Sequence, residues 1–159
     1  MLDMNLLSYR LGRRRLPLAG GPYRNRPVGT YGVKMAMEID EPCDVDIPTR
    51  DFDVPDRDDL IRGVEQGLDA MWDTRMVYVG CMGGIGRTGL YMAAMAKLLG
   101  YDDPVQYVRD EYYSHAVETK QQMEYIDSLQ FPLRLRMKVK WRALTSYMRP
   151  LPTLTPNIG

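Results

Sequence analysis

One stretch of this chain, RMVYVGCMGGIGRTGLYMAAMAKLLG at positions 75–100, most restricts the folds open to it. It runs from a short apolar segment typical of a buried strand (75–80), through a glycine-rich turn, into an apolar helix over 88–99 that Gly100 would end. The main-chain N–H groups at the start of such a helix bind phosphate readily. The stretch therefore predicts an α/β unit with a phosphate site at its turn.

The rest of the chain supplies further strands and helices. Alternating apolar residues at 30–39 and 43–47 predict two short strands. Helical spacing begins at Asp56 and returns over 103–113 and 118–130. These elements predict an α/β fold with a small, central, mostly parallel sheet flanked by helices.

Charge is segregated along the chain although the net charge is zero. Residues 1–37 carry seven basic residues and one acid. Residues 38–127 carry eight basic residues and twenty acids, and residues 128–159 carry six basic residues and no acid. Basic ends on an acidic body could bring an anionic partner such as RNA to the ends. The alternative is that the ends fold back on the acidic body or are simply solvated.

The basic ends also suggest how the chain is divided. Residues 1–27 are rich in Arg, Gly and Pro and predict an irregular arm, followed by a folded unit at 28–131 and a tail at 132–159. The tail alternates like a strand over 133–141, yet five of its apolar residues also fit a helical stripe, and its length favours a helix before a proline-rich end. The stripe is Leu133, Met137, Trp141, Leu144 and Met148.

Composition excludes several classes of protein. A chain of 159 residues suits one domain with a core of its own. The only sustained apolar run, 90–99, is too short to cross a bilayer. Two cysteines cannot form a disulfide framework, so we expect the protein to be located in the reducing cytoplasm. With one histidine, the two cysteines also cannot form a structural zinc site.

The glycine-rich turn fits two phosphate-binding patterns. Residues 84–89 match G-x-G-x-x-G, and Asp102 and Asp103 follow at the distance of a ribose-binding acid in dinucleotide-binding folds. This pattern usually opens its sheet, however, whereas here only helical segments follow it. Asp103 also suits the cap of the helix that begins at Pro104.

The second pattern, C-x5-R-T from Cys81 to Thr88, gives a role to every polar residue of the turn. A cysteine attacks as its thiolate, which main-chain N–H groups and a helix N-terminus would stabilise. The same N–H groups, from Met82, Gly83, Gly84, Ile85, Gly86 and Arg87, would bind a phosphate dianion. Arg87 can grip two phosphate oxygens, and the hydroxyl of Thr88 can ease departure of the sulfur.

Three segments in this order resemble the protein tyrosine and dual-specificity phosphatase superfamily. VGCMGGIGRTG resembles its phosphate-binding loop, RDFDVP (50–55) its mobile acid loop, and HAVETKQQMEYI (115–126) the loop that positions the hydrolytic water. The similarity covers about residues 43–127, and it makes 28–131 the catalytic domain. A phosphorylated protein is the substrate that the resemblance implies.

The resemblance implies a metal-independent, cofactor-free reaction in two steps. Cys81 would attack phosphorus while Asp51 protonates the leaving oxygen, giving a cysteinyl-phosphate. Water placed by Gln122 and Glu118 would then hydrolyse it. Asp53 is the rival of Asp51, but the aromatic residue and the proline that follow favour Asp51.

One residue departs from the family pattern, and two alternatives follow. Gly80 stands where the family usually has histidine, a change that would weaken activity. The first alternative is a phosphate-recognition module without turnover. The second is an RNA 5′-phosphatase with the same chemistry, for which the basic ends would provide the RNA contacts.

Overall fold

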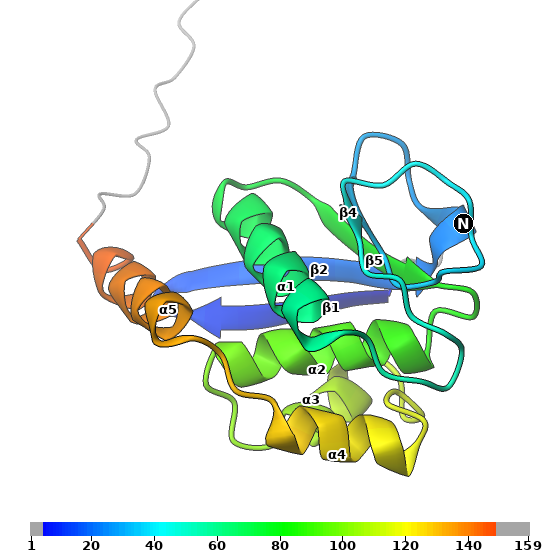
Figure 1. Ribbon diagram of the computed structural model, residues 1–159. Coiled ribbons are helices and arrows are strands. Elements are labelled where there is room, and N and C mark those ends of the chain that lie inside the picture. Colours follow the sequence, from blue (N-terminus) through cyan, green and yellow to red (C-terminus); the bar gives the residue numbers. More distant parts are fainter. Residues whose placement is uncertain (1–4, 149–159) are drawn as a thin grey trace, which may run out of the picture.

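The computed structural model describes residues 5–148 as a five-stranded sheet with helices packed on it (Figure 1). The strands lie in the order β1-β2-β5-β3-β4. β1 and β2 form an antiparallel hairpin, whereas β2, β5, β3 and β4 run parallel to their neighbours. The strands are β1 Asn5–Leu11, β2 Arg14–Pro22, β3 Tyr31–Lys34, β4 Val45–Asp46 and β5 Val77–Cys81. The predicted α/β class with a mostly parallel sheet is confirmed.

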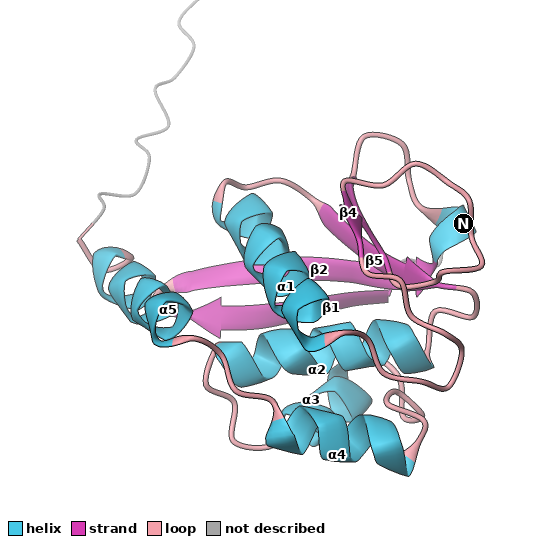
Figure 2. Ribbon diagram, in the orientation of Figure 1, coloured by secondary structure: helices cyan, strands magenta, loops and turns pink. Residues whose placement is uncertain are grey.

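Five α-helices and one short 3-10 helix complete the described part of the chain (Figure 2). They are η1 Tyr23–Asn25, α1 Arg57–Trp72, α2 Gly86–Leu98, α3 Pro104–Glu111, α4 Lys120–Ser128 and α5 Leu133–Thr145. α1 and α2 pack against each other and against the sheet, and the hydroxyl of Tyr91 on α2 donates to the carbonyl of Gly63 on α1 at 2.9 Å. α3 and α4 lie against α2 (Figure 1).

Local sequence explains where the helices begin and end. The Asp56 and Asp103 side chains accept from the main-chain N–H groups of Asp59 and Gln106, which caps α1 and α3. Gly100, at φ +90°, follows the end of α2 in the left-handed region that glycine tolerates. β5 is buried along its whole length, because it lies in the middle of the sheet under α1 and α2.

The predicted irregular arm is wrong for residues 5–22. This segment forms β1 and β2, and β2 pairs with β5 in the middle of the sheet. Leu7, Tyr9 and Leu11 alternate into the core, which is the period-two pattern of a strand. The remaining boundaries of the predicted domains stay predictions.

The other predicted elements differ from the observed ones mainly in length. The strands expected at 30–39 and 43–47 are shorter, as β3 and β4, and the tail helix is confirmed as α5. The proline-rich end, residues 149–159, lies outside the described residues. Within 5–148, no helix has both the length and the apolar content to span a bilayer.

Candidate active site

The carboxyl end of β5 meets the start of α2 at the predicted phosphate loop. Cys81 is the last residue of β5, and α2 begins at Gly86. Ligands of parallel α/β sheets bind at this end of the strands. The Cys81 sulfur is buried and lies 3.3 Å from the main-chain nitrogen of Gly84 and 3.2 Å from the Thr88 hydroxyl oxygen. Both groups donate to the sulfur, as the stabilisation of a thiolate requires.

Arg87 lies buried beside this sulfur, with only 2% of its surface exposed. Its Nη1 and Nη2 donate to the two carboxylate oxygens of Glu38 at 2.8 and 2.6 Å, and Nη1 also donates to the Thr49 carbonyl at 2.9 Å. Its Nε is buried and has no hydrogen-bond partner among the described residues. A buried N–H group without a partner is costly, and a bound phosphate oxygen would satisfy it.

The Glu38–Arg87 pair keeps both side chains charged. The hydrogen bonds from Arg87 hold the pKa of Glu38 below its ordinary value of 4.5. Burial by itself lowers the pKa of Arg87, but the hydrogen bond with Glu38 and the negative charge of Glu38 help to outweigh it, so the pKa is raised. The guanidinium is therefore held in one orientation as a permanent cation.

Sequence analysis missed Glu38 and Thr49, because no motif surrounds them. Strand pairing brings them to the site. β3 lies next to β5 in parallel register, with Lys34 opposite Gly80, so the segment that follows β3 emerges beside Cys81. Knowing that β3 neighbours β5 would have been the only signal.

The acid loop brings Asp51 to the same place. Asp51 Oδ1 lies 3.5 Å from Arg87 Nη2, and 59% of the Asp51 side chain is exposed. Each side chain accepts from the next main-chain nitrogen, Asp51 at 3.1 Å and Asp53 at 2.8 Å, but within residues 5–148 only Asp51 forms an ion pair with Arg87. The geometry thus favours Asp51 over Asp53 as the acid.

The two expected water-positioning residues lie at the start of α4. Gln122 is fully buried, and its Oε1 accepts from the main-chain nitrogens of Glu118 and Thr119 at 2.8 and 3.3 Å. Its Nε2 donates to the Asp53 carbonyl at 3.1 Å, so Gln122 joins α4 to the acid loop. The Glu118 carboxylate covers Gly86, where an added Cβ would lie 2.3 Å from its Oε2. It therefore complements the positive end of α2.

Close packing explains the glycine that stands in place of histidine. A Cβ on Gly80 would lie 2.6 Å from the Cα of Tyr23 and 2.7 Å from the Gly21 carbonyl oxygen. Gly84, at φ +73°, meets the same segment, because its added Cβ would lie 2.3 Å from the Gly21 carbonyl carbon. The end of β2 therefore supports the back of the loop and leaves no room for a side chain at position 80.

The outer side of the loop is open. Nothing lies within 4 Å of a Cβ added to Gly83, and 42% of Met82 is exposed. Ile85, which precedes α2, is half-buried. A substrate can therefore approach from the side of Met82 and Gly83.

The dinucleotide interpretation does not fit this arrangement. Asp103, offered as a ribose-binding acid, accepts from the main-chain nitrogen of Gln106 at 3.1 Å and caps α3. Between the glycine-rich turn and residue 148, the chain forms no further strand. A dinucleotide fold needs strands after its first turn.

Sequence comparison gives relatives over part of the chain. No family model matches the chain. The uncharacterized proteins MJECL20 and MJ0215 of Methanocaldococcus jannaschii are 38% and 36% identical to it over 80 residues, which is 50% of this chain and 54% and 50% of theirs. The chain thus matches about half the length of these curated relatives.

Solved structures give a likeness over most of the chain. Tk-PTP in its active form has a TM-score of 0.57 and 19% identity, covering 85% of this chain and 97% of its own. PTPMT1 in complex with PI(5)P has a TM-score of 0.57 and 20% identity, covering 86% and 98%. Kinase associated phosphatase has a TM-score of 0.56 and 17% identity, covering 86% and 96%. The chain has the fold of the protein tyrosine and dual-specificity phosphatases.

Proposed function

We propose that this chain is a phosphoric monoester hydrolase that removes phosphate from phosphotyrosine through a cysteinyl-phosphate intermediate. One observation carries the proposal. A buried arginine, oriented by Glu38 and left with a free Nε, adjoins a cysteine sulfur that accepts two hydrogen bonds. This arrangement offers a nucleophile and an oxyanion clamp at one point.

In the first step, the Cys81 thiolate attacks phosphorus and the bond from phosphorus to the leaving oxygen breaks. Asp51 gives its proton to that oxygen, so the alcohol leaves neutral. The main-chain N–H groups of residues 82–87 and the Arg87 guanidinium bind the equatorial oxygens while charge moves through the transition state. Asp51 is exposed beside Arg87, where a leaving group would emerge.

In the second step, water attacks the cysteinyl-phosphate and gives a proton to Asp51, now a base. The bond from sulfur to phosphorus breaks, and the Thr88 hydroxyl donates to the departing sulfur, as it does in the free protein. Gln122 and Glu118 stay predicted positioning residues for this water. Because the Gln122 amide is bound to the Asp53 carbonyl, we expect Gln122 to act partly by holding the acid loop.

The surroundings of the loop favour an aryl phosphate. Three large apolar side chains are exposed next to the proposed chemical groups: Met37 precedes Glu38, Phe52 follows Asp51 and Met82 follows Cys81. Such side chains can pack on the ring of a phosphotyrosine. Phosphoserine and phosphothreonine are the further substrates to test. We also propose that the reaction takes place in the cytoplasm.

Hydrolysis of para-nitrophenyl phosphate tests the proposal. We expect turnover that vanadate inhibits, that a chelator leaves unchanged and that Cys81→Ser abolishes. Cys43→Ser is the matched control, since Cys43 is the other free cysteine and none of the site contacts involves it. Asp51→Ala should lower kcat by about a hundredfold or more, and Asp53→Ala much less. Turnover that survives Cys81→Ser would refute the proposal.

The second candidate is a phosphate-recognition module without turnover, suggested by the absence of histidine at position 80. It predicts that a phosphotyrosine peptide binds the wild-type protein and is recovered intact. A substrate trap with Asp51→Ala, followed by identification of the retained molecule, also distinguishes a phosphoprotein from an RNA 5′ end.

A further inference from the structure

The two basic segments, distant in sequence, meet at one end of the molecule. The turn between β1 and β2 packs on the last turn of α5, where the Arg13 main-chain nitrogen donates to the Ser146 hydroxyl at 2.9 Å. The Arg13 guanidinium lies over the Tyr147 ring, 5.3 Å from its centre. This end is opposite the loops that carry the candidate active site (Figure 1).

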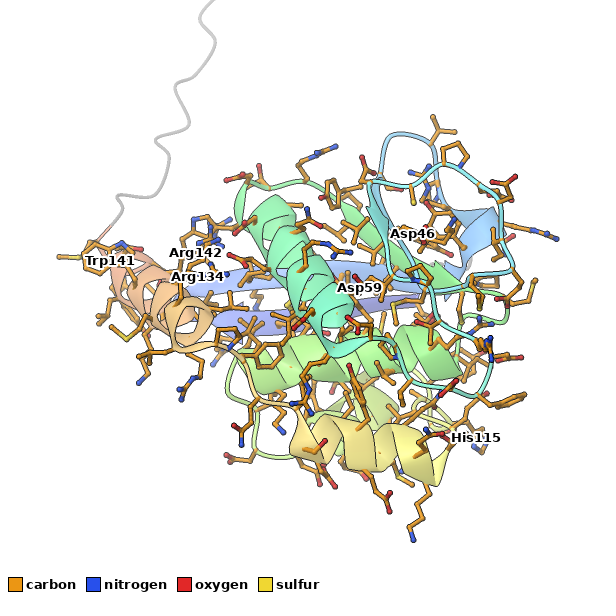
Figure 3. The ribbon with its side chains drawn as sticks, viewed as in Figure 1. Asp46, Asp59, His115, Arg134, Trp141 and Arg142 are labelled. Atoms are coloured by element: carbon orange, nitrogen blue, oxygen red, sulfur yellow. The ribbon has the colours of Figure 1, made fainter. Side chains whose placement is uncertain are left out.

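One side of α5 is committed to the body of the protein. Leu135 and Val139 are buried. Arg134, Lys138 and Arg142 form ion pairs with Glu65 and Asp69 of α1, with closest distances of 2.7, 2.9 and 2.7 Å. Figure 3 places Arg134 and Arg142 toward α1 and Trp141 at the outer end of the helix. Part of the basic tail therefore does fold back on the acidic body.

The opposite side of α5 is a continuous apolar stripe that faces solvent. Its members recur every three or four residues, which places them on one helical face. Each is between 57 and 79% exposed. The stripe consists of Leu133, Met137, Trp141 and Leu144 on α5 and Met148 in the turn that follows it. Exposed apolar side chains in such a contiguous set mark an interaction surface.

Unpaired cations border the stripe. Arg136 and Lys140 are exposed and form no ion pair within residues 5–148. No acid occurs anywhere in residues 128–159. An exposed apolar face with Lys and Arg at its edge is the pattern of a helix that lies in the interface of an anionic bilayer.

We propose that α5 docks this protein on an anionic lipid surface, with the apolar stripe in the interface and Arg136 and Lys140 at the headgroups. A second copy of the chain fits less well, because the same cations would oppose one another with no acid between them. A nucleic acid would leave Leu133, Met137 and Leu144 exposed. A protein groove that encloses a helix does not fit, because the inner side of α5, with Leu135 and Val139, is already buried against the body of the protein.

The fold places this surface away from the candidate active site. The nine residues of β2 run from Arg14, beside α5, to Pro22, beside Cys81. At about 3.3 Å per residue, the eight steps from Arg14 to Pro22 separate the two ends by about 26 Å. A docked molecule would therefore keep its phosphate loop open to solvent, and docking can be tested independently of hydrolysis.

Vesicle sedimentation with the whole chain tests the proposal. We expect binding to vesicles of equimolar phosphatidylcholine and phosphatidylglycerol, weakened by salt, and little binding to phosphatidylcholine alone. Trp141 supplies a direct signal, since it is exposed while Trp72 is buried. Its fluorescence should shift to the blue on binding, and Trp141→Phe should remove the shift.

Two double variants, each with a matched control, separate the contribution of the apolar stripe from that of the two cations. Met137→Ser with Trp141→Ser should weaken binding about tenfold or more. Arg136→Gln with Lys140→Gln should weaken it about twenty-five-fold, at about fivefold for each cation. Val28→Ser, an exposed apolar residue outside α5, and Lys120→Gln on α4 should change nothing. All should hydrolyse para-nitrophenyl phosphate like the wild type.

Three results would overturn the proposal. The first is equal sedimentation with both kinds of vesicle, or with neither. The second is a stripe variant that changes a dimer to a monomer in gel filtration, which would assign the face to a second copy. The third is binding of a short RNA that the stripe variants leave intact and that vesicles fail to compete away.

Discussion

At the scale of single residues, Glu38 orients Arg87, the group on which the proposed chemistry most depends. Its carboxylate takes two of the hydrogen bonds of Arg87 and leaves Nε free. An arginine held in this way loses little entropy when phosphate binds, so its transition-state hydrogen bonds are gained at low cost.

Replacement of Glu38 by glutamine should therefore lower kcat/KM for para-nitrophenyl phosphate by about ten- to a hundredfold. The isosteric amide cannot accept from both guanidinium nitrogens through two oxygens. Glu41→Gln is the matched control, because Glu41 follows in the same loop and pairs with Arg24 at 3.6 Å. Equal activity of the two variants would show that Glu38 does not contribute to activity by orienting Arg87.

Gly80 offers a test of the packing behind the loop. A methyl group there would collide with the main chain of Tyr23 and Gly21, so Gly80→Ala should lower the free energy of unfolding by about 1–3 kcal/mol. Gly83→Ala, at an open position of the same loop, should change stability far less. Denaturant unfolding of both variants gives the comparison, and similar losses would contradict the packing argument.

Sequence predicted the contiguous part of the candidate site better than its assembled part. Cys81, Arg87 and Thr88 are recognisable because one loop and one helical turn fix their spacing. Asp51 is recognisable through the aromatic residue and the proline that follow it. Glu38 is not, because its role arises from the pairing of β3 with β5, which no local pattern encodes.

At the scale of elements, the start of α4 couples two loops. Thr119 and Gln122 form a reciprocal cap, and the remaining amide group of Gln122 holds the acid loop through the Asp53 carbonyl. The position of Asp51 thus depends on a helix more than sixty residues away in sequence.

Loss of this amide should have two effects. Gln122→Ala should lower the free energy of unfolding by about 2–3 kcal/mol, since buried main-chain donors lose their acceptor, and should lower kcat as the acid loop loosens. Gln121→Ala, on the exposed side of α4, is the control for the helix itself. A stable, fully active Gln122→Ala variant would contradict the coupling.

Elements were predictable where pattern and capping agree. The caps at Asp56 and Asp103 predict the starts of α1 and α3, and the apolar run predicts β5. β1 and β2 were missed because the arginines of their turn and Pro17, Gly20 and Gly21 obscure the alternation of buried residues. For α5, sequence supplied the apolar stripe but not the acidic face of α1, which turns the stripe outward.

At the scale of the whole molecule, α1 and α5 are joined by charge. The pKa of Glu65 is lowered from 4.5 to about 2, mainly by the hydrogen bond from Arg134. Burial opposes this effect, and the hydrogen bond from Lys138 adds to it. Because the pKa in the folded state is depressed, the stabilisation is complete above about pH 4.5 and is lost as the pH falls toward about 2.

Glu65→Gln should therefore flatten the dependence of the free energy of unfolding on pH between about 4.5 and about 2. Glu124→Gln, which removes an exposed pair with Lys120 on α4, is the matched control. Urea unfolding across this range measures both. An unchanged slope in Glu65→Gln would show that the network contributes nothing to folding.

The most direct test of the whole account is to find the phosphate on sulfur. Wild-type protein mixed with para-nitrophenyl phosphate and quenched within a turnover should yield, by peptide mass spectrometry, one phosphate on Cys81, and Cys81→Ser should yield none. Turnover with no phosphate on Cys81, or with phosphate on another residue, would contradict the central claim that this buried sulfur is the nucleophile.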